Sequence, residues 1–259
     1  MLKKHFEVFL KYKNLILYLA KNQISLKYRK SYLGLLWSLL NPLLTMLVLT
    51  MVFSSIFKNK IENFPIYLMC GRLIYEYNAE STKTAMNAVI SNSSLIKKIY
   101  IPKYVFPLSS SIAALVNMFF SLIALVIVML ATQLSLKWTM LFIWVPMLYV
   151  FIFSTGLGLV LASANVFFRD TKHLYGVFLT LWMYLTPLFY PIESVSPEVQ
   201  KIIGYNPLYH FISIFRGMML DGVLPSFREN IICLGTGLVV LLLGLFCFKK
   251  SQDKFILHI

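Results

Sequence analysis

The stretch from Ser31 to Phe57 contains no charged residue, although it follows a segment rich in lysine and arginine. A bilayer core is about 30 Å thick, so a helix rising about 1.5 Å per residue needs about 20 apolar residues to cross it. Hydrophobic residues make up 59% of the whole chain and charged residues only 13%, which is more apolar surface than one water-soluble core can bury. We therefore predict an all-α polytopic membrane protein.

The same length rule predicts six transmembrane helices. Their expected ranges are 35–57, 65–89, 106–131, 139–165, 174–192 and 230–248. An even number of crossings places both termini on one side, and most lysines and arginines outside these ranges fall in segments on that side. Such segments are usually cytoplasmic, so we expect cytoplasmic N- and C-termini. The net charge of +14 then indicates membrane topology and not a nucleic-acid partner.

Residues 1–33 alternate cations with apolar residues at spacings that a helix gathers on one face. This pattern favours an interfacial amphipathic helix in the cytoplasmic headgroup layer, and Gly34 is where the chain can turn into the first span. A solvated basic tail, placed there by the positive-inside rule alone, is the alternative.

Residues 92–101, between the second and third predicted spans, combine lysines with apolar side chains. A short helix can begin at the Ser/Asn cluster, and Pro102 must stop it. We expect Ile96, Ile99 and Tyr100 to be exposed beside charged groups, which indicates a docking surface for another protein. The candidate docking residues here are Ile96, Lys97, Lys98, Ile99, Tyr100 and Pro102.

Residues 197–220 belong to a stretch that is too apolar for an ordinary outer loop. The same stretch is interrupted by too many prolines to form a transmembrane span. Ser196 before Pro197 and Asn206 before Pro207 each resemble an N-cap followed by a first-turn proline. The pattern predicts two short helices, 197–204 and 207–220. Non-helical chain at membrane depth occurs where protein or water covers it, so we interpret this region as re-entrant gate helices at an external pore mouth.

A charged stripe runs along the second predicted span, where Arg72, Glu76, Glu80 and Lys83 follow at steps of four, four and three. These steps place the four side chains on one helical face. Each charge at the bilayer centre costs about 2.5 to 3.5 kcal/mol, so the stripe should not face lipid. It is either the polar wall of a conduit or an ion-pair network that holds helices together.

The sequence lacks several motifs of catalysis and nucleotide binding. There is no GxxxxGK[ST] phosphate loop, so the chain by itself cannot bind ATP through that motif. The four histidines are scattered, without the spacing of metal ligands. We expect a transport subunit, not an enzyme, with no cofactor or metal of its own and with energy supplied by a partner.

Four stretches together resemble one family, the permease subunits of ABC-2 type exporters that move lipid-linked polysaccharides such as O-antigen, capsule and teichoic acid precursors. The stretches are LKYRKSYLGLLWSLLNPLL, LIKKIYIPKYVFPLS, NVFFRDTKHLY and TPLFYPI followed by NPLYHFISIFRGMMLDG. They occur in the family's order over nearly the whole chain. The charged stripe of the second span departs from the family, in which mostly polar or aromatic residues are expected there.

The resemblance implies a homodimer in the bacterial cytoplasmic (inner) membrane that works with two copies of an ABC ATPase, which would bind ATP and Mg. It implies that residues 92–101 dock on that ATPase as a coupling helix, together with Arg169 and Asp170. The implied substrate is a lipid-linked glycan of the undecaprenyl pyrophosphate type. Cations that could bind its head at the cytoplasmic entrance are Lys27, Arg29 and Lys30, although the positive-inside rule alone would also place them there.

A glycan conduit requires aromatic faces for sugar rings and polar groups for hydroxyls. The candidate residues of the conduit and gate are Arg72, Glu76, Glu80, Trp182, Tyr184, Phe189, Tyr190, Asn206, Pro207 and Arg216. Aromatic residues also gather at both membrane interfaces in any membrane protein, which is the competing explanation for the tyrosines and tryptophan.

Three other functions stay open from the sequence. The same fold could export a small molecule or a lipid. A membrane enzyme acting on lipid-linked sugars could use Glu76 or Glu80 as acid or base. An ion channel or secondary carrier could use the charged stripe.

Overall fold

The computed structural model describes residues 2–29, 31–57, 61 and 63–259, and all regular structure in that part of the chain is helical. The longer helices are α1 (Leu2–Tyr28), α2 (Trp37–Phe57), α3 (Phe64–Ser91), α5 (Val105–Ala131), α6 (Trp144–Phe167), α7 (Thr171–Leu185) and α10 (Phe227–Ser251). The shorter ones are η1 (Gly34–Leu36), α4 (Ser93–Lys98), η2 (Trp138–Phe142), η3 (Ile192–Ser194), α8 (Pro197–Gly204), α9 (Pro207–Arg216), the π-helical turn η4 (Gly217–Asp221), η5 (Gln252–Lys254) and α11 (Phe255–His258).

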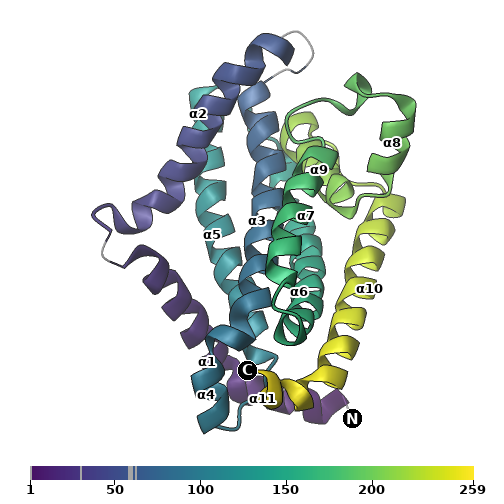
Figure 1. The fold of residues 1–259 in the computed structure, drawn as a ribbon. Coiled ribbons are helices and arrows are strands. Elements are labelled where there is room, and N and C mark those ends of the chain that lie inside the picture. Colours follow the sequence, from purple (N-terminus) through teal and green to yellow (C-terminus); the bar gives the residue numbers. More distant parts are fainter. Residues whose placement is uncertain (1, 30, 58–60, 62) are drawn as a thin grey trace.

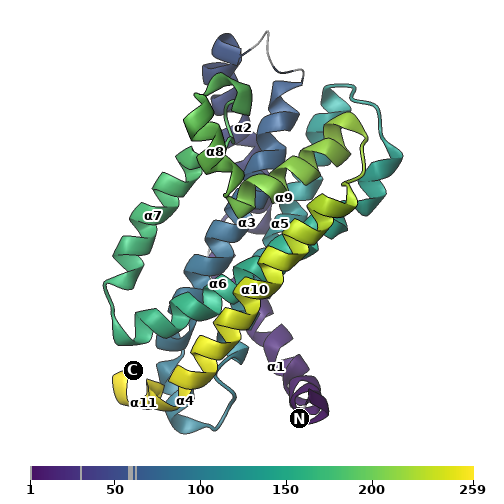
Figure 2. The same cartoon turned by 90° about the vertical axis from the view of Figure 1, so that its right-hand side faces the viewer.

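Helix α3 is the centre of the bundle and packs against α5, α6 and α9. Helix α10 lies along α6, and α1 lies along α5. Both views place the two termini, α4 and α11 at one end of the molecule, which we call the terminal end, and α8 and α9 toward the opposite, distal end (Figures 1 and 2). The terminal end therefore carries the predicted docking segment, and the distal end carries the predicted gate helices.

Four helical segments of the described chain are long and apolar enough to cross a bilayer. They are Gly34–Phe53, Val105–Ala131, Trp138–Phe167 and Phe227–His258, and they match the first, third, fourth and sixth predicted spans. The second predicted span is α3, which is 28 residues long but carries the charged stripe. The count of six stays a prediction.

The fifth predicted span, 174–192, is a shorter helix in the structure. Helix α7 has 15 residues and ends at Leu185, because Pro187 disfavours a helical conformation at Thr186, whose backbone is extended. Fifteen residues span about 22 Å, which is less than a bilayer core of about 30 Å. The helix therefore covers only part of the predicted range.

The first helix buries one side against another helix, and its position in a headgroup layer stays a prediction. Ile16, Leu19 and Ala20 are buried where α1 packs along α5, whereas Leu17 and Tyr18 are exposed. The helix ends at Tyr28 and not near residue 33. Gly34 then adopts a positive φ of 49° in the turn toward α2, a conformation that glycine adopts without strain.

The contact between α6 and α10 is unusually close. A Cβ added at Gly244 would lie 2.2 Å from the carbonyl oxygen of Gly156, and one added at Gly156 would lie 2.5 Å from the backbone of Leu241. Small residues allow the backbones of membrane helices to approach in this way. The two helices therefore touch backbone to backbone along this stretch.

Candidate functional site

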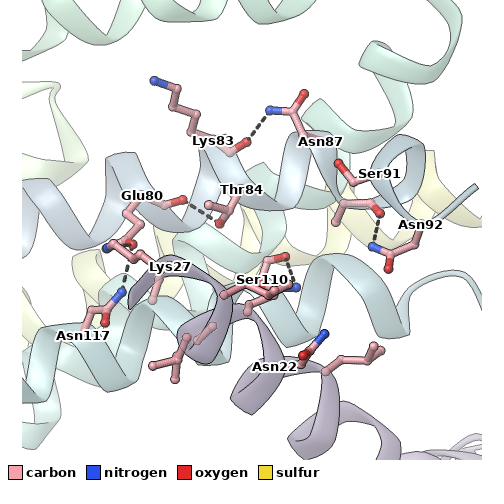
Figure 3. A pocket seen from close by; sticks show the side chains of 17 residues that line it. Asn22, Lys27, Glu80, Lys83, Thr84, Asn87, Ser91, Asn92, Ser110 and Asn117 are labelled. Atoms are coloured by element: carbon pink, nitrogen blue, oxygen red, sulfur yellow. Dashed lines mark hydrogen bonds and ion pairs between the residues drawn. The ribbon is translucent and has the colours of Figure 1, made fainter. Parts of the chain in front are cut away.

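A groove of about 710 Å³ lies between α1, α3 and α5 (Figure 3). Amide, hydroxyl and charged side chains from all three helices line it. They include Asn22, Lys27, Glu80, Lys83, Thr84, Asn87, Ser91, Asn92, Ser110 and Asn117. This set offers many hydrogen-bond donors and acceptors and both signs of charge, so the groove can bind a ligand rich in hydroxyl groups.

Glu80 joins the three helices at one end of this groove. Its Oε1 atom accepts hydrogen bonds from Lys27 Nζ of α1 at 2.5 Å and from Asn117 Nδ2 of α5 at 2.9 Å (Figure 3). The sequence placed Lys27 in a lipid-head set and Glu80 in a conduit set, and the structure brings them together. Their side chains are 47% and 31% exposed, so the ion pair remains accessible to water.

The other members of the charged stripe lie apart from this cluster. Arg72 pairs with Glu76 one turn along α3. Lys83 is exposed, and its side chain extends away from α1 (Figure 3). In the stripe, Arg72 pairs with Glu76, Glu80 pairs with Lys27 of α1, and Lys83 is exposed, so none of its charges is fully buried. Its residues line the grooves and also form contacts between helices.

A second groove of about 340 Å³ lies between α1, α2, α3 and α5 and is lined in part by Glu76, Tyr28 and Asn41. Lys27, Glu80 and Asn117 line both grooves. The ion pair therefore stands where the two grooves adjoin, and a ligand passing from one to the other must pass this cluster.

Two of the three cations proposed to bind a lipid head are described by the structure, and they line different grooves. Lys27 lies in the groove of Glu80, whereas Arg29 is exposed and lines a separate groove beside Leu17 and Ile112. Lys30 lies outside the described residues. Within the described part, an anionic head could contact Lys27 or Arg29 but would meet them in different cavities.

Asn117 is a site residue that the sequence analysis missed. It is an asparagine in the middle of the apolar span 106–131, and an amide in such a helix usually has a polar partner. That signal was available in the sequence. Its partner, Glu80, is separated by 37 residues and could not be identified from the pattern alone.

Arg216, at the distal end, is buried and donates hydrogen bonds to three backbone carbonyls. The acceptors are Tyr67 O at 3.2 Å, Pro187 O at 2.8 Å and Leu188 O at 3.1 Å. The guanidinium also lies 3.4 Å from the centre of the Tyr67 ring, and no carboxylate of the described chain forms a salt bridge with it. Burial lowers the pKa of this guanidinium from its ordinary value.

Gly71 leaves the space that the Arg216 guanidinium fills. A Cβ added at Gly71 would lie 2.5 Å from Arg216 Nη2, closer than non-bonded atoms approach. Arg216 thereby clamps the chain after α7 to the first part of α3. Arg216 is one of the predicted gate residues, but the sequence pattern did not indicate its burial.

Trp182 and Asn206, two predicted conduit residues, are buried and are joined by a hydrogen bond. Trp182 Nε1 donates to Asn206 Oδ1 at 2.9 Å, and Asn206 Nδ2 donates to Thr186 Oγ1 at 2.9 Å. Asn206 Oδ1 also accepts from Leu208 N, which caps α9 directly before Pro207. In the single chain these side chains fix the start of α9 against the end of α7.

The remaining aromatic candidates are nearer the surface. Tyr184 is exposed, and its carbonyl accepts a hydrogen bond from Tyr190 Oη at 2.7 Å. Phe189 is half-buried and stacks on Phe53 of α2, with ring centres 5.4 Å apart. The structure thus places Tyr184 where a ligand or a partner chain can reach it.

The predicted docking segment divides into a buried and an exposed part. Ile96 is 6% exposed and packs into the core, which corrects the expectation that it faces water: α4 turns it inward. Ile99 and Tyr100 are 55% and 96% exposed; they directly follow α4, and the backbone of Ile99 is extended. Lys97 and Lys98 are exposed beside them.

Arg169 and Asp170 occupy the exposed turn between α6 and α7. An Arg169 Nη2 hydrogen bond to the carbonyl of His258, 3.0 Å long, ties this turn to the C-terminus. The ring of His258 also packs on Phe167, with centres 4.9 Å apart. The C-terminal residues, α4 and this turn therefore share the terminal end.

Comparison with known proteins covers almost the whole chain. The family model of the ABC-2 type transporter matches residues 14–220. The chain is 27% identical over 246 residues to the O-antigen export system permease protein RfbA of Myxococcus xanthus, covering 94% of this chain and 95% of that protein. It is 23% identical over 248 residues to the polysialic acid transport protein KpsM of Escherichia coli, covering 89% and 91% of the two chains.

A third relative is the capsule polysaccharide export inner-membrane protein CtrC of Neisseria meningitidis, which is 23% identical over 242 residues and is covered over 89% of its length. The relatives are permease and transport proteins that carry similarity from end to end. With the family model matching well over half of its residues, this chain belongs to the ABC-2 type transporter family.

Proposed function

We propose that this protein is the membrane-spanning subunit of an exporter of lipid-linked polysaccharide, with undecaprenyl pyrophosphate as the lipid carrier. A separate ATPase, which binds ATP and Mg, drives the export, and this chain binds no cofactor itself. The observation that carries the proposal is the polar groove between α1, α3 and α5, found in a chain whose relatives are named for O-antigen and capsule export.

The chemistry of the groove suits a glycan. Sugar hydroxyls both donate and accept hydrogen bonds, and amides such as Asn22, Asn87 and Asn117 do the same. The groove continues past Lys27 and Glu80 into the second groove, which offers a polar path along α3. In this proposal the charged stripe is the wall of that path, and Lys27, which lines both grooves, is a cation of the path that a lipid pyrophosphate would meet.

Two copies of the chain are proposed to complete the conduit. Helix α2 exposes a run of apolar side chains, including Leu44, Leu47, Val48 and Met51. The second groove lies beside this helix, and both grooves lie beside α1. A second copy related by a twofold axis would face these grooves and supply the opposite wall. Short α7 and charged α3 would then cross the membrane inside an assembly, where neither needs to face lipid on all sides.

The ATPase is proposed to dock at the terminal end. Ile99 and Tyr100 form an exposed apolar projection flanked by Lys97 and Lys98, a combination that fits a groove on another protein. The turn with Arg169 lies at the same end. Both termini also lie there (Figure 1), which agrees with an even number of crossings and with cytoplasmic termini in a bacterial inner membrane.

The decisive experiment removes the gene and identifies what accumulates inside the cell. An undecaprenyl-linked polymer that disappears when the gene is restored supports the proposal. Accumulation of an unrelated small molecule or lipid, with normal surface glycan, would assign the chain to another cargo. Transport by the purified chain in liposomes without any ATPase would instead indicate a channel or secondary carrier.

Variants of α3 separate a conduit from an enzyme. Glu80→Gln and Glu76→Gln should each reduce export partially, because a wall residue contributes one contact among many. Glu193→Gln is the matched control, because Glu193 is an exposed glutamate that lines neither groove. Complete loss of a chemical change in the lipid-linked sugar with either glutamate variant would indicate catalysis.

A further inference from the structure

A cavity of about 720 Å³ at the terminal end lies between the chain around Ile99 and the last turns of α10. We call it the C-terminal groove and define it by Ile99, Ile101, Leu245, Lys249 and Ile256. None of these residues lines the groove of Figure 3. It is therefore separate from the proposed glycan path.

The C-terminal groove is apolar inside and basic at its rim. Lys249 lines it and is exposed, and it forms no ion pair with the described part of the chain. Lys103 also lines it but is engaged, because its Nζ donates to the carbonyl of Gln252 at 2.6 Å. Asp253 is the one carboxylate among the lining residues, so the groove as a whole favours an anion.

The apolar wall of the groove continues along the outside of α10. Leu242, Leu245 and Phe246 are 65%, 46% and 66% exposed, and all lie in a segment able to span a bilayer. Tyr100 of the docking segment also lines the groove, and its side chain is almost fully exposed. The groove thus combines an acyl-chain surface with a cationic head site at one membrane interface.

We propose that the C-terminal groove binds an anionic phospholipid of the membrane, with an acyl chain along Leu245 and Ile256 and the phosphate on Lys249. Basic pockets beside transmembrane helices on the cytoplasmic face bind anionic lipid heads in this way. The inference rests on the orientation in the proposed function, in which the terminal end is cytoplasmic. A bound lipid would contact both the docking segment and the last span, and so would link the two.

The test measures lipid binding to the purified full-length chain by native mass spectrometry, with phosphatidylglycerol and phosphatidylethanolamine as probes. Phosphatidylglycerol should bind preferentially. Lys249→Gln should weaken its binding about fivefold, the effect expected for one lysine near an anionic head. Lys250→Gln is the matched control, because Lys250 is also exposed but does not line the groove; it should bind like the wild type.

A second variant tests the acyl-chain surface without changing charge. Leu245→Trp should fill part of the groove and reduce binding of both lipids. Equal losses with Lys249→Gln and Lys250→Gln would overturn the proposal, since they would indicate attraction to a basic surface and not a site. Crosslinking of Lys249→Cys to a partner protein, with no lipid preference, would also overturn it and assign the groove to that protein.

Binding is measured without transport, an ATPase or membrane sidedness. A failed binding test therefore leaves the proposed export function intact, and loss of export in cells leaves the binding result intact.

Discussion

Two cations contact α3, Arg216 near its first turn and Lys27 near its middle, and they are held by different kinds of partner. Arg216 is buried at the distal end, where three backbone carbonyls and one tyrosine ring surround it. Lys27 is half-exposed toward the terminal end and pairs with Glu80 in a groove. The partners of Arg216 are neutral groups that the fold holds in fixed positions. The partner of Lys27 is a partly exposed carboxylate side chain that can exchange this contact for another.

The difference indicates different roles. A buried guanidinium that loses its acceptors, or carbonyls that lose their donor, leaves unsatisfied polar groups at about 1 to 3 kcal/mol each. An exposed ion pair contributes about 0 to 1 kcal/mol because water and salt compete with it. Arg216 is therefore suited to hold α9 and the chain after α7 in place against α3, and the Lys27–Glu80 ion pair is suited to break and re-form.

The largest effect is expected from Arg216→Ala. Three carbonyls lose their donor at once, so the protein should lose about 3 kcal/mol or more of stability and most of its export activity. Thermal unfolding in detergent measures the first effect and surface glycan in complemented cells measures the second. Arg228→Ala, which removes an exposed arginine at the start of α10, is the control; equal behaviour of the two variants would refute the clamp.

A smaller loss is expected from Gly71→Ala. The added Cβ would lie 2.5 Å from Arg216 Nη2 and force the guanidinium out of line with its acceptors, an overpacking penalty of about 1 to 3 kcal/mol. The same unfolding measurement applies. In the double variant with Arg216→Ala the glycine substitution should have little further effect, and full additivity would show that Gly71 does not act through Arg216.

The Lys27–Glu80 pair should show little effect on stability and a clear effect on export. Lys27→Ala and Glu80→Gln should each change stability by less than about 1 kcal/mol, with a coupling of about 0.2 to 1 kcal/mol in a double-variant cycle. Exchange of the two charges, Lys27→Glu with Glu80→Lys, should restore export relative to either single change. If the charge exchange does not restore export, then each charge acts at its own position and the ion pair itself is not required.

The smallest effect is that of salt. The coupling between Lys27 and Glu80 should shrink as ionic strength rises from about 0.1 to 1 M, because the screening length falls from about 10 to 3 Å. The contribution of Arg216 should stay constant, since its acceptors are neutral and buried. Repeating the unfolding series at both salt concentrations distinguishes the two cations without further variants.

Local sequence rules predicted the elements at the distal end well. Helices begin at Pro197 and Pro207 as the proline pattern indicated; Asn206 caps its helix through its side chain, whereas the side chain of Ser196 forms no capping hydrogen bond. These rules depend on neighbouring residues only. The end of α7 was also encoded locally, in Pro187, but the apolar run that follows it favoured a longer span.

Features that depend on distant residues could not be predicted. The burial of Ile96 depends on the core that other helices build around α4. The partner of Glu80 lies on α1, 53 residues away, and the close contact of Gly156 with Gly244 joins helices far apart in the chain. A pattern identifies a polar or small residue in an apolar helix but not the residue that it meets.

The contact of Gly156 with Gly244 also limits how the protein can move. Sliding of α6 along α10 would carry the side chains next to these glycines into the facing backbone, where even a Cβ does not fit, so the two helices should move as one rigid unit. Bending is then left to their outer connections, the turn around Arg169 and the left-handed Gly222 before α10. A transport cycle in this chain would hinge at those two joints.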